Sequence, residues 1–225
     1  MTAAAGNVIN DYFDWKTDKV AGKTRWQFSR YLLLVVYALL LVASIGLSFM
    51  MLPKMAHQLV LLNHFLLFMY AWQLKSTVLI GNFIIAFLSA STLLMLKLCY
   101  DFSDAIAVAF ILFSFASSLF REIVKDLQDK EADQKANITT SATTYSLRHN
   151  KAILWCVLVV WIVLPLILAI LFNQMPFYIT AGCNFIACIY LGFLLFSSQE
   201  NEDFRRLSGY TKATMFIGIL TIVFY

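Results

Sequence analysis

Two short segments of this chain concentrate side chains that bind cations. The first holds Asn10, Asp14 and Asp18, and the second holds Asp129 and Asp133. Residues four apart lie on one face of a helix, so each segment would present a stripe of oxygen ligands. Like charges at this spacing repel by about 0.2 to 0.5 kcal/mol per pair, and a bound cation offsets that cost. Mg²⁺ suits such stripes, because it takes oxygen ligands and is commonly held by one or two carboxylates plus substrate phosphates.

Basic residues accompany these carboxylates. Arg121 and Lys125 continue the stripe of Asp129 and Asp133 at four-residue spacing, and Lys75 stands alone in a short turn. Guanidinium and ammonium groups donate to phosphate oxygens, so the combination suits a diphosphate bridged by Mg²⁺. A different interpretation fits the spacing equally well, in which the acidic residues form a solvated rim balanced by the lysines between them.

The elements that must position these residues are membrane helices. Of the 225 residues, 61% are hydrophobic and 13% charged, and the mean hydropathy of +0.76 excludes a soluble or disordered chain. Charge-free runs approach the ~20 helical residues that cross a bilayer. They cover residues 31–52, 55–74, 76–96 and 105–120, a hairpin within 152–199 broken at Asn173 to Pro176, and residues 207–225. We therefore predict an all-α, multi-pass bundle of about seven full spans, preceded by a short helical remnant that ends near Asp18.

The basic residues also predict the orientation. Fifteen of the 17 Lys and Arg lie in alternate segments, namely residues 1–30, the Lys75 turn, 121–151 and 199–212. Because positively charged loops stay in the cytoplasm, we expect the N-terminus and both acidic segments on that face. Lys75 fits this topological role as well as it fits a phosphate contact.

The amino-acid sequences of the two acidic segments resemble the motifs of the UbiA superfamily of intramembrane prenyltransferases. That family carries NDxxDxxxD and DxxxD motifs, which read here as residues 10–18 and 129–133. The phrases GNVINDYFD, LIGN and REIVKD look most like its digeranylgeranylglyceryl phosphate synthase branch and the bacterial relatives of that branch. The resemblance covers nearly the whole chain, which we expect to be one domain, residues 1–225. Family members have nine helices, and their first motif ends the second helix. Because only nine residues precede Asn10 here, we expect the first helix and most of the second to be missing.

The resemblance implies an enzyme. Its reaction would be Mg²⁺-dependent transfer of a prenyl group from a polyprenyl diphosphate to a lipid or an aromatic quinone precursor, within a bacterial inner membrane and without nucleic acid. The residues it implies are these: Asp14 and Asp129 as catalytic residues; Asn10, Asp14, Asp18, Asp129 and Asp133 as metal ligands; Lys75, Arg121 and Lys125 as diphosphate contacts; and Asp11 and Asp126 as further candidates.

Rival classes fit less well. A secondary transporter would place ionisable residues near the bilayer midplane, whereas these spans are nearly charge-free at their centres. A CDP-alcohol phosphotransferase would interleave glycines with its aspartates, and neither acidic segment contains one. A shortened, inactive family member or a non-catalytic membrane protein stays open as an alternative.

Overall fold

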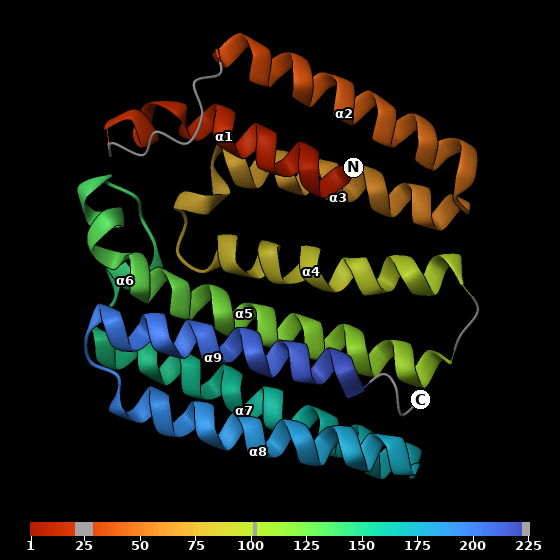
Figure 1. The fold of residues 1–225 in the computed structure, drawn as a ribbon, viewed down its shortest axis with the longest axis vertical. Coiled ribbons are helices and arrows are strands. Elements are labelled where there is room, and N and C mark those ends of the chain that lie inside the picture. The colour runs from red at the N-terminus through yellow and green to blue at the C-terminus, as the bar shows by residue number, and fades with distance from the viewer. Residues whose placement is uncertain (21–28, 101–102, 222–225) are drawn as a thin grey trace.

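The computed structural model describes residues 1–20, 29–100 and 103–221, and the side chains of residues 16–20 lie outside the described part. Throughout those ranges the regular structure is helical, with no strand, as predicted (Figure 1). The helices are α1 (Thr2–Val20), α2 (Arg30–Met51), α3 (Lys54–Trp72), η1 (Leu74–Ser76), α4 (Ile80–Cys99), α5 (Asp104–Lys135), α6 (Ser141–Thr144), α7 (Leu147–Phe172), α8 (Met175–Ser197) and α9 (Asn201–Leu220).

Among the residues that the structure describes, five helices are long and apolar enough to cross a membrane, namely α2, α4, α5, α7 and α8. The long helices α3 and α9 also follow predicted runs, but they carry more polar residues, and the count of seven spans is not confirmed. The predicted hairpin is present: α7 ends at Phe172, and Asn173 turns the chain with a φ of 49°. The predicted N-terminal helix corresponds to α1, whose 19 residues span about 28 Å and end at Val20, two residues beyond Asp18.

Helix α5 is the centre of the bundle and packs against α4, α7 and α9 (Figure 1). Its 32 residues span about 48 Å, well beyond the ~30 Å of hydrocarbon, so the acidic segment continues the membrane helix past its apolar stretch. The end of α1, η1, the end of α5 and the α8–α9 connection lie at the same end of the bundle, as expected for the described parts of these segments.

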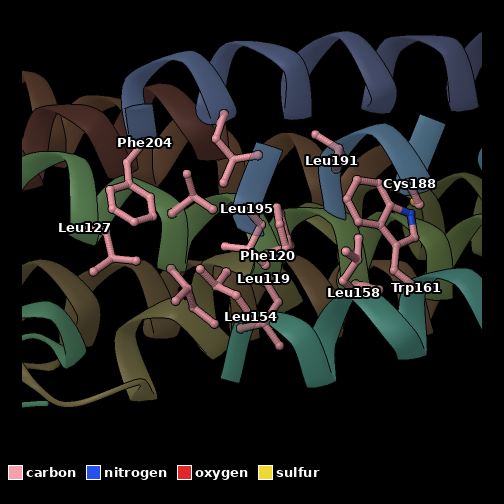
Figure 2. Close-up of a cluster of buried hydrophobic side chains, with 14 of the residues drawn as sticks. Leu119, Phe120, Leu127, Leu154, Leu158, Trp161, Cys188, Leu191, Leu195 and Phe204 are labelled. Atoms are coloured by element: carbon pink, nitrogen blue, oxygen red, sulfur yellow. The ribbon is translucent and has the colours of Figure 1, made fainter. Parts of the chain in front are cut away.

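The largest apolar side chains pack between α5, α7, α8 and α9. The ring centroid of buried Trp161 lies 5.8 Å from those of both Phe113 and Phe120, and Leu158 and Leu191 extend this cluster (Figure 2). Dispersion and close packing are the main attraction between helices in lipid, where burial from water contributes little. This packed half of the bundle therefore supports the acidic end of α5.

The α1–α4 half is held by smaller and more polar contacts. Buried His64 on α3 bonds through Nε2 to Ser44 Oγ on α2 at 3.0 Å, and Thr2 Oγ1 lies 3.1 Å from the same hydroxyl. These contacts place the start of α1 midway along α2. The helices approach closely there: a Cβ at Gly6 would lie 2.7 Å from Leu67 Cδ2, so the small residues at the start of α1 fit against the neighbouring helices.

Helices α7 and α8 share a hydrogen bond that compensates for a proline. Pro165 lies inside α7 and has no N–H, which leaves the carbonyl four residues earlier, at Trp161, without its helical donor. Asn184 Nδ2 on α8 donates to that carbonyl at 3.0 Å, and both residues are buried. In a bilayer no water replaces such a bond, so a neighbouring helix has to supply the donor.

Asn184→Leu should lower stability by about 1 kcal/mol, the scale of interhelical hydrogen bonds in membranes. In a Pro165→Ala background the carbonyl regains a helical donor, so Asn184→Leu should cost clearly less. The coupling between the two residues is measured by unfolding wild type, the two single variants and the double variant in mixed micelles. Equal costs in the two backgrounds would contradict the compensation.

Candidate active site

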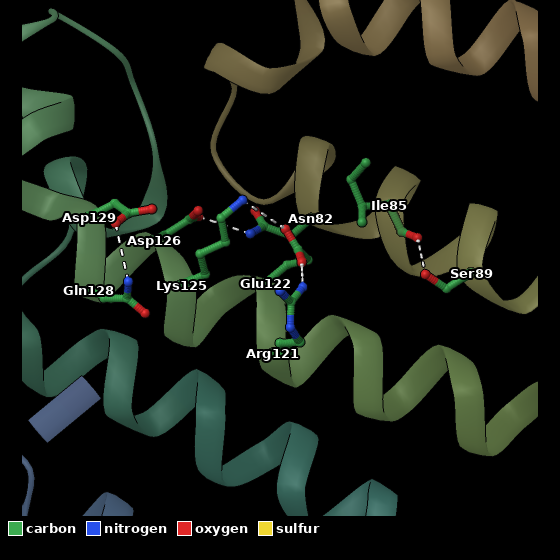
Figure 3. Close-up of polar contacts among 9 residues, drawn as sticks. All are labelled: Asn82, Ile85, Ser89, Arg121, Glu122, Lys125, Asp126, Gln128 and Asp129. Carbon is green, nitrogen blue, oxygen red and sulfur yellow. Dashed lines mark hydrogen bonds and ion pairs between the residues drawn. The ribbon is translucent and has the colours of Figure 1, made fainter. Parts of the chain in front are cut away.

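A polar pocket opens at the acidic end of the bundle, between α3, η1, α4 and α5. Its volume, including the part that is open to solvent, is about 290 Å³. Its lining combines two carboxylates, two ammonium groups, an amide and a phenol, as Figure 3 shows in part. The lining residues are Tyr70, Lys75, Gly81, Asn82, Glu122, Lys125 and Asp126.

The segment that joins η1 to α4 places one wall of the pocket. Leu79 adopts a φ of 63°, the left-handed region, directly before α4 begins at Ile80. At Gly81 a Cβ would lie 2.9 Å from the Leu74 carbonyl oxygen and 3.3 Å from Lys75 Cα, so only glycine allows η1 to approach so closely. This approach brings Lys75 and Asn82 to the same pocket. It gives the glycine and the asparagine of the LIGN sequence, residues 79–82, a physical role.

Helix α5 supplies the opposite wall through Glu122, Lys125 and Asp126. Asn82 Nδ2 donates to Asp126 Oδ2 at 2.9 Å, while Glu122 forms an ion pair with Arg121 and lies 3.9 Å from Lys125 Nζ (Figure 3). Asp126 lies beyond the apolar stretch of α5. Burial there raises the pKa of its carboxyl to about 7, against the hydrogen bond from Asn82, which lowers it. Near neutral pH an arriving cation would therefore displace a proton from this wall.

The first acidic segment reaches the pocket through Lys75. Asn10 Nδ2 donates to Asp14 Oδ2 at 2.8 Å, and the Lys75 ammonium forms an ion pair with Asp14 Oδ1. Burial lowers the pKa of Lys75, whereas its contact with Asp14 favours the charged form. Since Lys75 also lines the pocket, this one side chain connects the two acidic segments.

The other predicted residues lie around this centre. Asp129 and Asp133 stand about one and two turns beyond Asp126 on α5, where Asp129 Oδ1 is 3.5 Å from Gln128 Nε2 and Asp133 contributes to the raised pKa of Asp126. Asp11 is half-buried on α1, and the Asp18 side chain lies outside the described residues.

Sequence reasoning missed Tyr70, Asn82 and Glu122 as pocket residues. Asn82 carried a usable signal, because a single amide at the start of an apolar helix is costly unless it has a partner. Tyr70 and Glu122 carried none, since a tyrosine near a helix end is common at membrane interfaces and a glutamate in an acidic run is unremarkable.

The donors present suit a hard divalent cation. In the described ranges no three His, Cys, Asp or Glu side chains come close enough together to hold a metal by themselves. Mg²⁺ does not require such a group, because it keeps several waters and takes one or two carboxylates together with substrate phosphates. The Asn82 amide and the Asp126 carboxylate line the pocket, and Asp14 lies next to it through its ion pair with Lys75, so oxygen donors of this kind are present.

Gly81→Ala should lower activity by about tenfold and also lower thermal stability, because the added Cβ meets backbone atoms of η1. The added Cβ pushes η1 and Lys75 outward by a few tenths of an ångström, and a full ångström of misplacement can cost ~10²-fold. Gly46→Ala on α2 is the matched control, because a Cβ there meets nothing within 4 Å. Equal activity of the two variants would remove the positioning role of Gly81.

Comparison with known proteins places this architecture in a family. The model of the UbiA prenyltransferase family matches residues 1–220. Digeranylgeranylglyceryl phosphate synthase of Methanosarcina mazei is 30% identical over 99% of this chain and 78% of its own length. The enzyme of that name from Methanopyrus kandleri is 32% identical over 64% of this chain, and that alignment spans only about half, 54%, of the relative.

Solved structures agree with the sequence matches. A structure reported for digeranylgeranylglyceryl phosphate synthase in membranes superimposes with a TM-score of 0.82 at 28% identity, covering 98% of this chain and 80% of that one. A UbiA homologue from Archaeoglobus fulgidus, solved with Cd²⁺, gives a TM-score of 0.66 at 14% identity over 99% of this chain and 83% of that one, a likeness of fold alone. The chain is therefore an integral membrane protein that belongs to the UbiA prenyltransferase family.

Proposed function

We propose that this prenyltransferase moves a prenyl group from a polyprenyl diphosphate to the hydroxyl of a glycerol phosphate lipid. The observation that carries the proposal is the polar pocket in which Lys75, held by Asp14, faces Asn82, Lys125 and Asp126. Cationic donors and carboxylates around one opening suit a diphosphate accompanied by a divalent cation. The names of the two relatives described above favour a lipid acceptor over an aromatic one.

In this reaction the allylic C–O bond of the donor breaks and the diphosphate leaves. The acceptor hydroxyl forms a new C–O ether bond and releases its proton to water. A bound Mg²⁺ would supply electrostatic stabilisation of the negative charge that grows on the leaving diphosphate. The ligands we propose are Asn10, Asp14, Asp18, Asp129 and Asp133, with Asp11 and Asp126 as further candidates.

The chain's own basic residues do the remaining work. Lys75 and Lys125 line the pocket and are placed to donate to diphosphate oxygens. Arg121 pairs with Glu122 next to them and holds that carboxylate. Asn82 fixes the position of Asp126 through its amide N–H.

The test is a transfer assay with the purified protein in nanodiscs. We expect Mg²⁺-dependent transfer from radiolabelled geranylgeranyl diphosphate to geranylgeranylglyceryl phosphate, abolished by EDTA and restored by Mg²⁺. An aromatic acceptor such as 4-hydroxybenzoate is the comparison. Preferential prenylation of that ring would overturn the lipid acceptor, and an inactive protein with every donor and acceptor would favour a degenerate family member.

A further inference from the structure

Both oxygens of the Asp14 carboxylate are already occupied by side chains of the protein. Oδ2 accepts the amide N–H of Asn10 at 2.8 Å, and Oδ1 is paired with the Lys75 ammonium. The two side chains of this ion pair are only 21% and 23% exposed, so water and salt screen their charges less than on an open surface. A cation that approaches Asp14 therefore meets a fixed positive charge.

The opposite wall of the pocket is paired in the same way. Glu122 is held between Arg121 and Lys125, and Asp126 accepts a hydrogen bond from Asn82. Within the described part of the chain, the carboxylates that line the pocket thus each have an internal partner. This arrangement offers a lone metal ion neither a free cluster of acids nor a strongly negative pocket.

We infer that Lys75 is a tethered counter-ion that weakens metal binding at Asp14 until a diphosphate arrives, so that the metal and the diphosphate bind cooperatively. The inference rests on the proposed function and adds an order of events to it. Lys75 both contacts Asp14 and lines the pocket, so its ammonium can exchange one partner for the other. Diphosphate oxygens accept charge-assisted hydrogen bonds from it, and this releases Asp14 Oδ1 for a cation.

The exchange requires little movement of the backbone. Gly81 lets η1 lie against the first turn of α4, which fixes Lys75 Cα at the edge of the pocket. The ammonium group of Lys75 can still move, because it stands on a flexible four-carbon side chain. Binding linkage is reciprocal, so the diphosphate should raise metal affinity by the same factor as the metal raises diphosphate affinity.

The experiment measures Mg²⁺ binding by calorimetry, with and without inorganic pyrophosphate, corrected for the complex that the two form in solution. Wild-type protein should bind Mg²⁺ alone weakly and at least tenfold more tightly with pyrophosphate present. Lys75→Gln should bind Mg²⁺ alone about tenfold more tightly than wild type, equivalent to about 1.4 kcal/mol, and should lose most of the pyrophosphate effect.

Two variants serve as controls. Lys75→Arg keeps the cation and should retain the wild-type pattern. Lys97→Gln removes a lysine that pairs with Asp104 at 2.7 Å near the other end of α4, and should bind both ligands as wild type does. These two variants separate the contact with Asp14 from a general change in net charge.

Three results would overturn the inference. One is Mg²⁺ binding to wild type that is equally tight with and without pyrophosphate, which needs no variant to fold. Another is Lys75→Gln with the wild-type affinity for Mg²⁺ alone. A third is wild type that binds neither ligand. The proposed function fails differently, through wild type that binds Mg²⁺ and pyrophosphate cooperatively but transfers no prenyl group.

Discussion

Asp14→Ala and Asp129→Ala should each lower prenyl transfer by about 10²- to 10³-fold, while the protein stays folded. The loss is that expected when one preorganised group that stabilises developing charge is removed. Asp14 contributes through both its oxygens, which meet Asn10 and Lys75 at the edge of the pocket. Asp129 lies about one turn beyond Asp126 and continues the acidic face of α5.

Stability and activity should separate in these variants. The Asp14 variant loses a partly buried ion pair, which costs more than the roughly 1 kcal/mol of a fully exposed pair but leaves the apolar packing of the bundle in place. Asp104→Ala is the matched control, because it breaks the pair with Lys97 away from the pocket and should leave transfer unchanged. The measurements are initial transfer rates and thermal melting side by side. A wild-type transfer rate in either aspartate variant would contradict an active site formed by both acidic segments.

Asn82→Leu should lower transfer by about 10- to 100-fold, the usual loss when a residue that orients a ligand is replaced. Asn82 holds Asp126 through a 2.9 Å hydrogen bond, and leucine of similar size leaves that carboxylate without the donor. Because this bond lowers the pKa of Asp126, its loss should raise that pKa further. The acid limb of the rate profile should then move to higher pH.

Asn63→Leu provides the matched control for this change. Asn63 on α3 donates to Ser91 Oγ on α4 at 2.9 Å, so it links helices without contacting a carboxylate. We expect this variant to lose some thermal stability and to keep the wild-type pH profile. The same rate loss and pH shift in both variants would show that Asn82 acts only by holding the helices together.

The sequence predicted the bundle well because membrane helices appear in a sequence as long runs without charge. Runs without charge predicted the apolar helices α2, α4 and α5, and the Asn-Gln-Met-Pro break predicted the turn that Asn173 makes between α7 and α8. The packing of the start of α1 was not predicted, because its small residues near Gly6 lack the hydrophobicity of a span and reveal their role only through contact with Leu67.

The candidate site was harder to predict, since periodicity does not fix the rotation of a helix. Along α5 the four-residue repeat singled out Arg121, Lys125, Asp129 and Asp133, whereas the pocket is lined by Glu122, Lys125 and Asp126. Which face of α5 meets α4 depends on the packing of the whole bundle. The role of Lys75 was similarly ambiguous, because only the structure shows its contact with Asp14.

The bond between Asn184 and the Trp161 carbonyl also limits how this chain can evolve. A mutation of Asn184 alone leaves a carbonyl without a donor inside the membrane. A mutation of Pro165 alone returns the helical donor to that carbonyl, whose two lone pairs can accept both the helical N–H and the Asn184 amide. Replacement in evolution should therefore follow one order, in which the proline is lost before the asparagine.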